Sequence, residues 1–262
     1  MTRRTAATRE SNGEPVEVSG LIDLHTHVLP GIDDGAASFA EAEAMCRAAA
    51  ADGCTALVAT PHLRHARFWN GERRELEALF DEARERLGGE IELHLGGEIA
   101  VHFESVDEIF ELPRGELLTL AGSRYALLEL DWHGIGPDVF DVVHELKVRG
   151  LFPIIAHPER VSWLSSDSRL VESLVARGAY VQITAMSLTG ELGGGLRKLC
   201  EEWIEAGWVH FVASDAHGAR LRPPGLAAAY RQVARRFGEE VAARLFVDQP
   251  AAVLDDRPLD RV

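Results

Sequence analysis

Cysteine is scarce in this sequence. Only Cys46, Cys54 and Cys200 are present, and they lie far apart in the chain. Three cysteines without a C-x-x-C pair provide neither a disulfide framework nor a paired-thiol motif. This usage is typical of a reducing compartment, so the expected location is the cytoplasm.

The chain also lacks a long apolar run and an excess of positive charge. Its 262 residues are 46% hydrophobic and 26% charged, and no uncharged segment is long enough to predict membrane insertion. The net charge of −15 argues against a nucleic-acid partner, because such proteins usually neutralise phosphates with a basic face. Residues 1–19 have no apolar segment after Arg3 and Arg4, so we expect a disordered leader and not an export signal.

Linkers rich in proline, glycine or serine are missing from the rest of the chain, so we expect residues 20–262 to form one domain. Apolar segments alternate with helical patterns along it. Strands are predicted at 21–27, 55–60, 91–97, 125–128, 152–156, 180–183 and 209–213. Helices are predicted at 38–52, 71–87, 138–149, 167–177, 196–206, 224–237 and 239–254. This alternation indicates a parallel α/β fold.

The first strand runs directly into two histidines. If residues 23–27 are extended, side chains alternate and His25 and His27 point the same way, where they can bind one ion. Pro30 and Gly31 then break the strand, and the loop after them can return Asp33 and Asp34 over the strand end. This fragment alone fits a buried histidine pair without a metal equally well.

The other strand ends decide between these interpretations. Six of the seven predicted strands are followed by side chains that commonly ligate metals. The complete set is His25, His27, Asp34, His62, Glu98, Glu129, His157, Asp215 and His217. An open sheet would spread these residues along one edge, whereas a closed barrel brings all strand ends to one mouth. We therefore predict a barrel with the nine residues at its mouth.

Four carboxylates in one mouth would repel one another unless cations neutralised them. Mixed imidazole and carboxylate ligands suit manganese, iron or zinc better than calcium or magnesium. Nine ligands are too many for one ion, so two or three are expected. Ions roughly 3.5 to 4 Å apart can share a carboxylate and clamp a phosphoryl group for in-line attack.

Five motifs then identify a resemblance. They are D-L-H-T-H-V-L-P-G-I-D-D-G-A at 23–36, V-A-T-P-H at 58–62, G-G-E-I at 96–99, A-H-P-E-R at 156–160 and A-S-D-A-H at 213–217 with R-P-P at 222–224. In this order they resemble the PHP superfamily, and more closely its bacterial CpsB/YwqE-type protein-tyrosine phosphatases. The resemblance runs from about residue 21 to residue 254.

The resemblance implies a distorted (β/α)7 barrel of the PHP type, similar to a TIM barrel. It implies a trinuclear manganese centre held by the nine residues, with Glu98 bridging, and it matches Arg160 and Arg222 to phosphate-binding arginines. The implied activity is hydrolysis of phosphotyrosine by a metal-activated hydroxide. The implied partner is a tyrosine autokinase of capsule or exopolysaccharide synthesis. For each arginine, a salt bridge to a nearby carboxylate such as Glu159 or Asp215 is the alternative.

Two other functions stay open at this point. A PHP phosphatase acting on a small phosphate monoester, such as histidinol phosphate, would use the same ions and arginines. A non-catalytic PHP scaffold is less compatible with a complete ligand set. Cysteine-based phosphatase chemistry is excluded, because no cysteine is followed by arginine six positions on. Loops 63–70 and 184–190 offer Phe68, Trp69 and Met186 to a phenyl ring. The oligomeric state is left open.

Overall fold

The computed structural model describes residues 18–68, 70, 72–87, 89, 91–102, 107, 109–111, 117–132 and 138–259. Val18 packs into the hydrophobic core. The residues before it, for which the sequence predicts a leader, lie outside the described ranges. Within those ranges, no helix combines the length and apolar character needed to cross a membrane.

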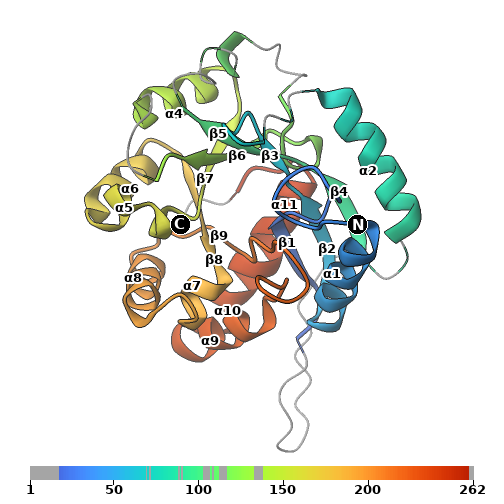
Figure 1. Cartoon of the computed structure of the whole chain (residues 1–262). Coiled ribbons are helices and arrows are strands. Elements are labelled where there is room, and N and C mark those ends of the chain that lie inside the picture. Colours follow the sequence, from blue (N-terminus) through green and yellow to red (C-terminus); the bar gives the residue numbers. More distant parts are fainter. Residues whose placement is uncertain are drawn as a thin grey trace, which may run out of the picture.

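Strands in the described residues pair in parallel and form two sheets (Figure 1). The smaller sheet has the order β1 (Leu21–Thr26), β2 (Cys54–Ala59), β4 (Glu92–Leu95). The larger has the order β3 (His62–Leu63), β5 (Glu98–Val101), β6 (Tyr125–Leu130), β7 (Phe152–Ala156), β8 (Tyr180–Thr184), β9 (Phe211–Ala213). The parallel α/β fold predicted from the sequence is confirmed.

The second and third predicted strands, seen as β2 and β4, end close to the predicted positions, but the sequence does not predict that each continues after a break, as β3 and β5. Pro61 separates β2 from β3 and has no N–H to donate to a ladder. Gly96 and Gly97 separate β4 from β5, which makes Glu98 the first residue of β5. The halves stay in register, since Gly96 N donates to Ala59 O at 2.8 Å and Glu98 N donates to Pro61 O at 3.0 Å.

Close packing explains the glycines at this break. A Cβ at Gly97 would lie 2.1 Å from Leu63 Cδ1, and one at Gly96 would lie 2.9 Å from both Val58 and Leu120 side chains. Any larger residue would displace these packed side chains. β3 continues β2, and β5 continues β4. When each such pair is counted as one strand, strands that are neighbours in the sheets are also consecutive in the chain. The hydrogen-bonded ladder is interrupted between the two sheets.

β1 and β9 meet at the junction of the two sheets. Thr26 forms a parallel bridge with Ala216. Asp215 N donates to His25 O and His27 N donates to Ala216 O, both at 2.9 Å. The first and last strands therefore present their carboxyl ends to the same place.

Most helices lie outside the strands, whereas α11 lies behind them in this view and packs into the cluster among the strands (Figure 1). The helices are α1 (Phe39–Ala51), α2 (Arg73–Leu87), α4 (Val139–Val148), α5 (Ser162–Ser165), α6 (Ser168–Ala176), α7 (Ala185–Thr189), α8 (Gly194–Glu205), α9 (Ala227–Phe237), α10 (Glu239–Ala243) and α11 (Gln249–Leu254). Ser38 caps α1 by accepting from Glu41 N, and Asp138 caps α4 by accepting from Phe140 N. Both caps stand where the sequence predicts the helices to begin.

Alternation along β6 connects the core to the mouth. Ala126, Leu128 and Leu130 belong to the large cluster between strands and helices. Tyr125 and Leu127 belong to a second cluster among the strands, which includes residues 251–253 of α11. Because side chains alternate along a strand, Glu129 continues the column of Tyr125 and Leu127. The face of β6 that is apolar at its amino end thus carries a carboxylate at its carboxyl end.

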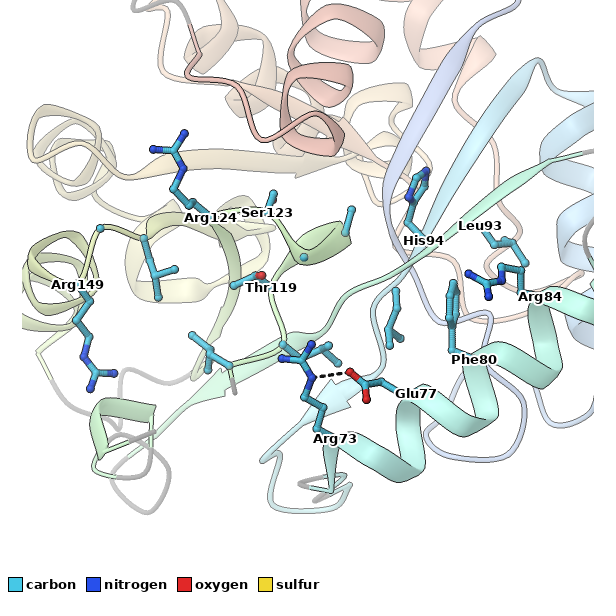
Figure 2. A pocket seen from close by; sticks show the side chains of 17 residues that line it. Arg73, Glu77, Phe80, Arg84, Leu93, His94, Thr119, Ser123, Arg124 and Arg149 are labelled. Carbon is cyan, nitrogen blue, oxygen red and sulfur yellow. Dashed lines mark hydrogen bonds and ion pairs between the residues drawn. The ribbon is translucent and has the colours of Figure 1, made fainter. Parts of the chain in front are cut away.

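A cavity of 560 Å³ lies at the amino ends of β6 and β7, away from the predicted ligands (Figure 2). Its apolar wall includes Phe80 of α2 and Leu93 of β4. Each of its four arginines already has a partner: Arg73 with Glu77, Arg84 with Asp81, Arg124 with Asp256, and Arg149 with the carbonyls of Ile109 and Phe110. The cavity contains no predicted site residue.

Candidate metal centre

His25 and His27 converge as predicted, with their Nε2 atoms 3.2 Å apart and no exposed surface. The loop after them is folded back by Gly31 N donating to Ala36 O and by Ala36 N donating to His27 O. Gly35 touches His27 so closely that a Cβ would lie 2.1 Å from the His27 carbonyl oxygen. This close approach places Asp34 Oδ1 3.3 Å from His62 Nε2 and 3.4 Å from His217 Nε2.

Glu98 lies at the centre of the histidines and is fully buried. Its Oε1 is 2.9 Å from His157 Nε2 and 3.3 Å from His25 Nε2. Its Oε2 is 2.9 Å from His62 Nδ1 and 3.4 Å from His27 Nε2. The two oxygens of one carboxylate thus face different imidazoles, as a bridging ligand would.

The two carboxylate oxygens of Asp215 also face different partners. Its Oδ1 is 3.4 Å from His25 Nε2 and 3.5 Å from His217 Nδ1. Its Oδ2 accepts hydrogen bonds from both Arg160 and Arg222. Asp215 and His157 have positive φ angles of 53° and 33°, in a region that non-glycine residues seldom occupy. Strained backbone of this kind is concentrated at functional sites.

Ligand atoms from these residues gather in four overlapping groups, each with its atoms within 4.8 Å of one another. The groups are His27–Asp34–His62–His217, His25–His157–Asp215, His25–His27–Glu98 and His62–Glu98–Glu129. All nine residues predicted from the sequence occur in them, and none lies elsewhere. Among the described residues, the cluster is therefore complete.

The electrostatics of the cluster favour a cation. Burial lowers the pKa of His27, but hydrogen bonds with Asp33 and Glu98 outweigh burial and raise it to about 9. Burial likewise opposes protonation of His62, yet Asp34, Glu129 and Glu98 hold its pKa above the usual range. The carboxylates around these imidazoles thus favour positive charge at this place. A divalent ion would supply that charge in place of protons, since a ligating histidine must be neutral.

The pKa values of two carboxylates, Asp34 and Glu98, are shifted in the opposite direction. Hydrogen bonds from His217 and His62 hold the pKa of Asp34 below its ordinary value. Burial raises the pKa of Glu98, but the charge of His25 and hydrogen bonds from His157 and His25 bring it well below the ordinary value. The buried Oε2 atoms of Glu98 and Glu129 lie 2.9 Å and 3.3 Å from His62 Nδ1, although neither forms a hydrogen bond of good geometry among the described residues. Buried carboxylate oxygens beside imidazoles fit divalent metal ions.

Two residues outside the nine predicted ligands hold His25 and His27 in place. Asp33 Oδ2 accepts from His27 Nδ1 at 2.8 Å and from His62 N at 3.2 Å. Gln182 Oε1 accepts from His25 Nδ1 at 2.9 Å. Both contacts leave Nε2 facing the cluster. A polar residue in the apolar strand Y-V-Q-I-T was the available indication for Gln182.

Replacing Asp33 should weaken metal binding without removing a predicted ligand. Outer partners of metal-ligating histidines typically contribute about 10- to 100-fold in affinity. We expect Asp33→Ala to lower manganese affinity by about that factor and Asp33→Asn to lower it less, because the amide oxygen can still accept from His27. Calorimetric titration of the metal-free protein measures this, with the exposed Asp81→Asn as control. Wild-type affinity in Asp33→Ala would exclude the role.

Aromatic side chains border the cluster on two sides. Phe68 stacks on His62 with ring centroids 5.8 Å apart, and His65 lies 5.0 Å from the same ring. Trp132, which the sequence analysis did not single out, lies 5.9 Å from the His157 ring, and the Arg160 guanidinium is 4.9 Å from its centroid. Trp69, the second predicted contact for a phenyl ring, lies outside the described residues.

Glu159 is not the partner of Arg160. Its buried Oε1 instead accepts from Thr184 N at 2.9 Å and from Ser187 Oγ at 2.8 Å. The turn that carries His157 and Arg160 is thereby fixed to the start of α7. The salt-bridge alternative left open by the sequence is realised with Asp215, where the arginine side chains are only 18% and 32% exposed.

Comparisons with known proteins agree with this geometry. Tyrosine-protein phosphatase YwqE of Bacillus subtilis is 35% identical over 223 residues, covering 84% of this chain and 87% of the relative. Tyrosine-protein phosphatase CpsB of Streptococcus pneumoniae is 30% identical over 242 residues, covering 90% of this chain and 99% of the relative.

Solved structures give the same result. The crystallographic work on YwqE from Bacillus subtilis and CpsB from Streptococcus pneumoniae describes them as unique metal-dependent tyrosine phosphatases. A chain from that work matches with a TM-score of 0.85 at 30% identity, covering 92% of this chain and 97% of that one. Dihydropyrimidinase from Brevibacillus agri, at 12% identity and a TM-score of 0.55, shares the fold alone. The model of the family described as capsular polysaccharide synthesis, CpsB/CapC, matches residues 21–255, and this chain belongs to that family.

Proposed function

We propose that this protein is a metal-dependent protein-tyrosine phosphatase. The observation that carries the proposal is the convergence of nine ligand-type side chains beside Arg160 and Arg222. Relatives named tyrosine-protein phosphatases support it. The physiological substrate we propose is a tyrosine autokinase of capsule or exopolysaccharide synthesis, met in the cytoplasm. Residues 20–262 would act as a single phosphatase domain.

We assign three ions, with manganese as the metal, to His25, His27, Asp34, His62, Glu98, Glu129, His157, Asp215 and His217. Four overlapping ligand groups support more than one ion, and the divided oxygens of Glu98 support a bridging role. Imidazole mixed with carboxylate suits manganese, with iron and zinc as the alternatives. When bound, such ions supply positive charge for the phosphoryl oxygens and activate water for in-line attack.

The residues of the chain itself position the phosphoryl group. Asp215 Oδ2 holds two guanidinium groups at one point beside the cluster, so their remaining N–H donors are oriented before substrate arrives. Planar forks of this kind match the oxygens of a phosphate monoester. Asp33 and Gln182 keep the first two histidines aimed at the same point.

The substrate class can be tested directly. We expect kcat/KM for a phosphotyrosine peptide to exceed by far that for the matched phosphoserine peptide and for histidinol phosphate. The physical reason is that aromatic side chains border the cluster and can pack against a phenyl ring. Initial rates with manganese-loaded protein measure all three. A preference for histidinol phosphate would assign the competing function, and no turnover of any of them would favour a scaffold.

A further inference from the structure

The proposed phosphatase needs a place for the ring that carries the phosphate, and the contacts of Trp132 provide one. Trp132 follows the end of β6 and lies three residues after Glu129. Arg160 Cζ lies 4.9 Å from the centroid of its indole, and the His157 ring stacks at 5.9 Å with an angle of 26°. Trp132 therefore touches both a predicted ligand and a predicted phosphate-binding arginine.

The backbone around Trp132 is held by α5. Ser162 Oγ donates to Trp132 O at 2.7 Å, and Trp163 Nε1 donates to Asp131 O at 3.0 Å. These bonds hold the backbone at Trp132 and leave its indole partly exposed. Its exposed fraction is 38%, and it is the one aromatic residue among the exposed large hydrophobic side chains of the described ranges.

We propose that Trp132 forms an aryl subsite that receives the phenyl ring of a phosphotyrosine while Arg160 and Arg222 hold its phosphoryl group. The phenyl ring of an aryl phosphate is separated from phosphorus by a single ester oxygen. A phosphoryl group at Arg160 therefore carries its ring next to the side chain that Arg160 itself contacts. Aromatic rings pair favourably at centroid distances of roughly 4.5 to 7 Å. This inference rests on the proposed function and names its specificity-determining residue.

Phe68 is the competing position for the ring. It borders the cluster at a different histidine, where it stacks nearly parallel to His62 at an angle of 5°. Its cation contact is with Arg67 at 5.0 Å, which is not one of the arginines held by Asp215. A substrate ring at Phe68 would therefore lie next to His62 and not next to the proposed phosphate-binding pair. Comparing substitutions at Trp132 and Phe68 separates the two positions.

The test compares kcat/KM for a phosphotyrosine peptide and the matched phosphoserine peptide in manganese-loaded protein. We expect Trp132→Ala and Trp132→Leu to reduce the tyrosine-to-serine ratio by about tenfold, mostly through KM, and Trp132→Phe to recover most of it. Trp208→Leu, the same substitution at a partly buried tryptophan that precedes β9, should leave the ratio as in the wild type. Metal content and melting temperature are measured for each variant.

A second measurement needs no variant. Phenylphosphonate should inhibit the wild-type holoenzyme more strongly than methylphosphonate, by about tenfold, because only the former has a ring for the subsite. Equal inhibition by the two would overturn the subsite. An unchanged tyrosine-to-serine ratio in Trp132→Leu would also overturn it, as would loss of that ratio in Phe68→Ala alone. If the wild type shows no preference for phosphotyrosine, the proposed function fails first.

Discussion

Removal of metal should abolish hydrolysis of a phosphotyrosine peptide and lower the melting temperature, and Mn²⁺ should restore both. The reason is that Glu98 and Asp215 are buried carboxylates surrounded by imidazoles. Without ions, only protons and two arginines offset their charge. An ion that binds only the folded state adds about 2.7 kcal/mol of stability at a hundredfold excess over its dissociation constant.

Three measurements check this expectation on the same sample. Elemental analysis before and after chelation gives the metal content, for which we expect about three ions per chain when manganese is restored. Thermal unfolding and peptide hydrolysis follow on the stripped and reloaded protein, and zinc and iron replace manganese in parallel samples. Full activity and an unchanged melting temperature in protein shown to be metal-free would refute the multinuclear centre.

The arginine variants should have the second large effect. Arg160→Ala and Arg222→Ala should each reduce kcat/KM for a phosphotyrosine peptide by about a hundred- to a thousandfold, or on the order of 2.7 to 4 kcal/mol, the typical cost of losing one preorganised donor to the transition state. The fold should persist, because Asp215 keeps the other arginine as its partner. Lysine should recover little, since a point charge cannot replace a bidentate fork.

The alternative role for each arginine is a salt bridge that only stabilises the fold. Exposed pairs contribute roughly 0 to 1 kcal/mol, so Arg169→Ala, which breaks an exposed pair with Asp167, is the matched control. Kinetics, metal content and thermal unfolding are measured for all variants. Near-normal kcat/KM in Arg160→Ala or Arg222→Ala would assign that arginine to Asp215 alone and remove it from the phosphate site.

Local sequence patterns were sufficient to predict the positions of the candidate ligands. The alternation of His25 and His27 placed both side chains on one side, and the order of strand ends brought residues as distant as Asp34 and His217 to 3.4 Å. The continuation of the second and third strands was not predicted. Pro61 and the glycines at 96 and 97 predict strand ends, whereas the pairing of β3 with β5 after them depends on contacts between segments distant in the chain.

Contacts between side chains around the ligand cluster could not be predicted from the sequence, for a different reason. Nothing local distinguishes Trp132 from a surface tryptophan, because its contacts come from His157 and Arg160 on another strand end. Gln182 and Asp33 acquire their roles in the same way, from imidazoles brought to them by the fold. The choice of Asp215 over Glu159 as the arginine partner likewise depends on where α7 begins.

The junction of β1 and β9 has a consequence for synthesis of the chain on the ribosome. Asp23 Oδ1 accepts from Ser214 N across 191 positions of sequence, so the two halves of the cluster are translated far apart in time. At roughly 5 to 20 residues per second, about 10 to 40 seconds separate them. During that interval His25 and His27 have emerged without Asp215 and His217. The nine-residue ligand set is therefore complete only after residue 217 has left the ribosome.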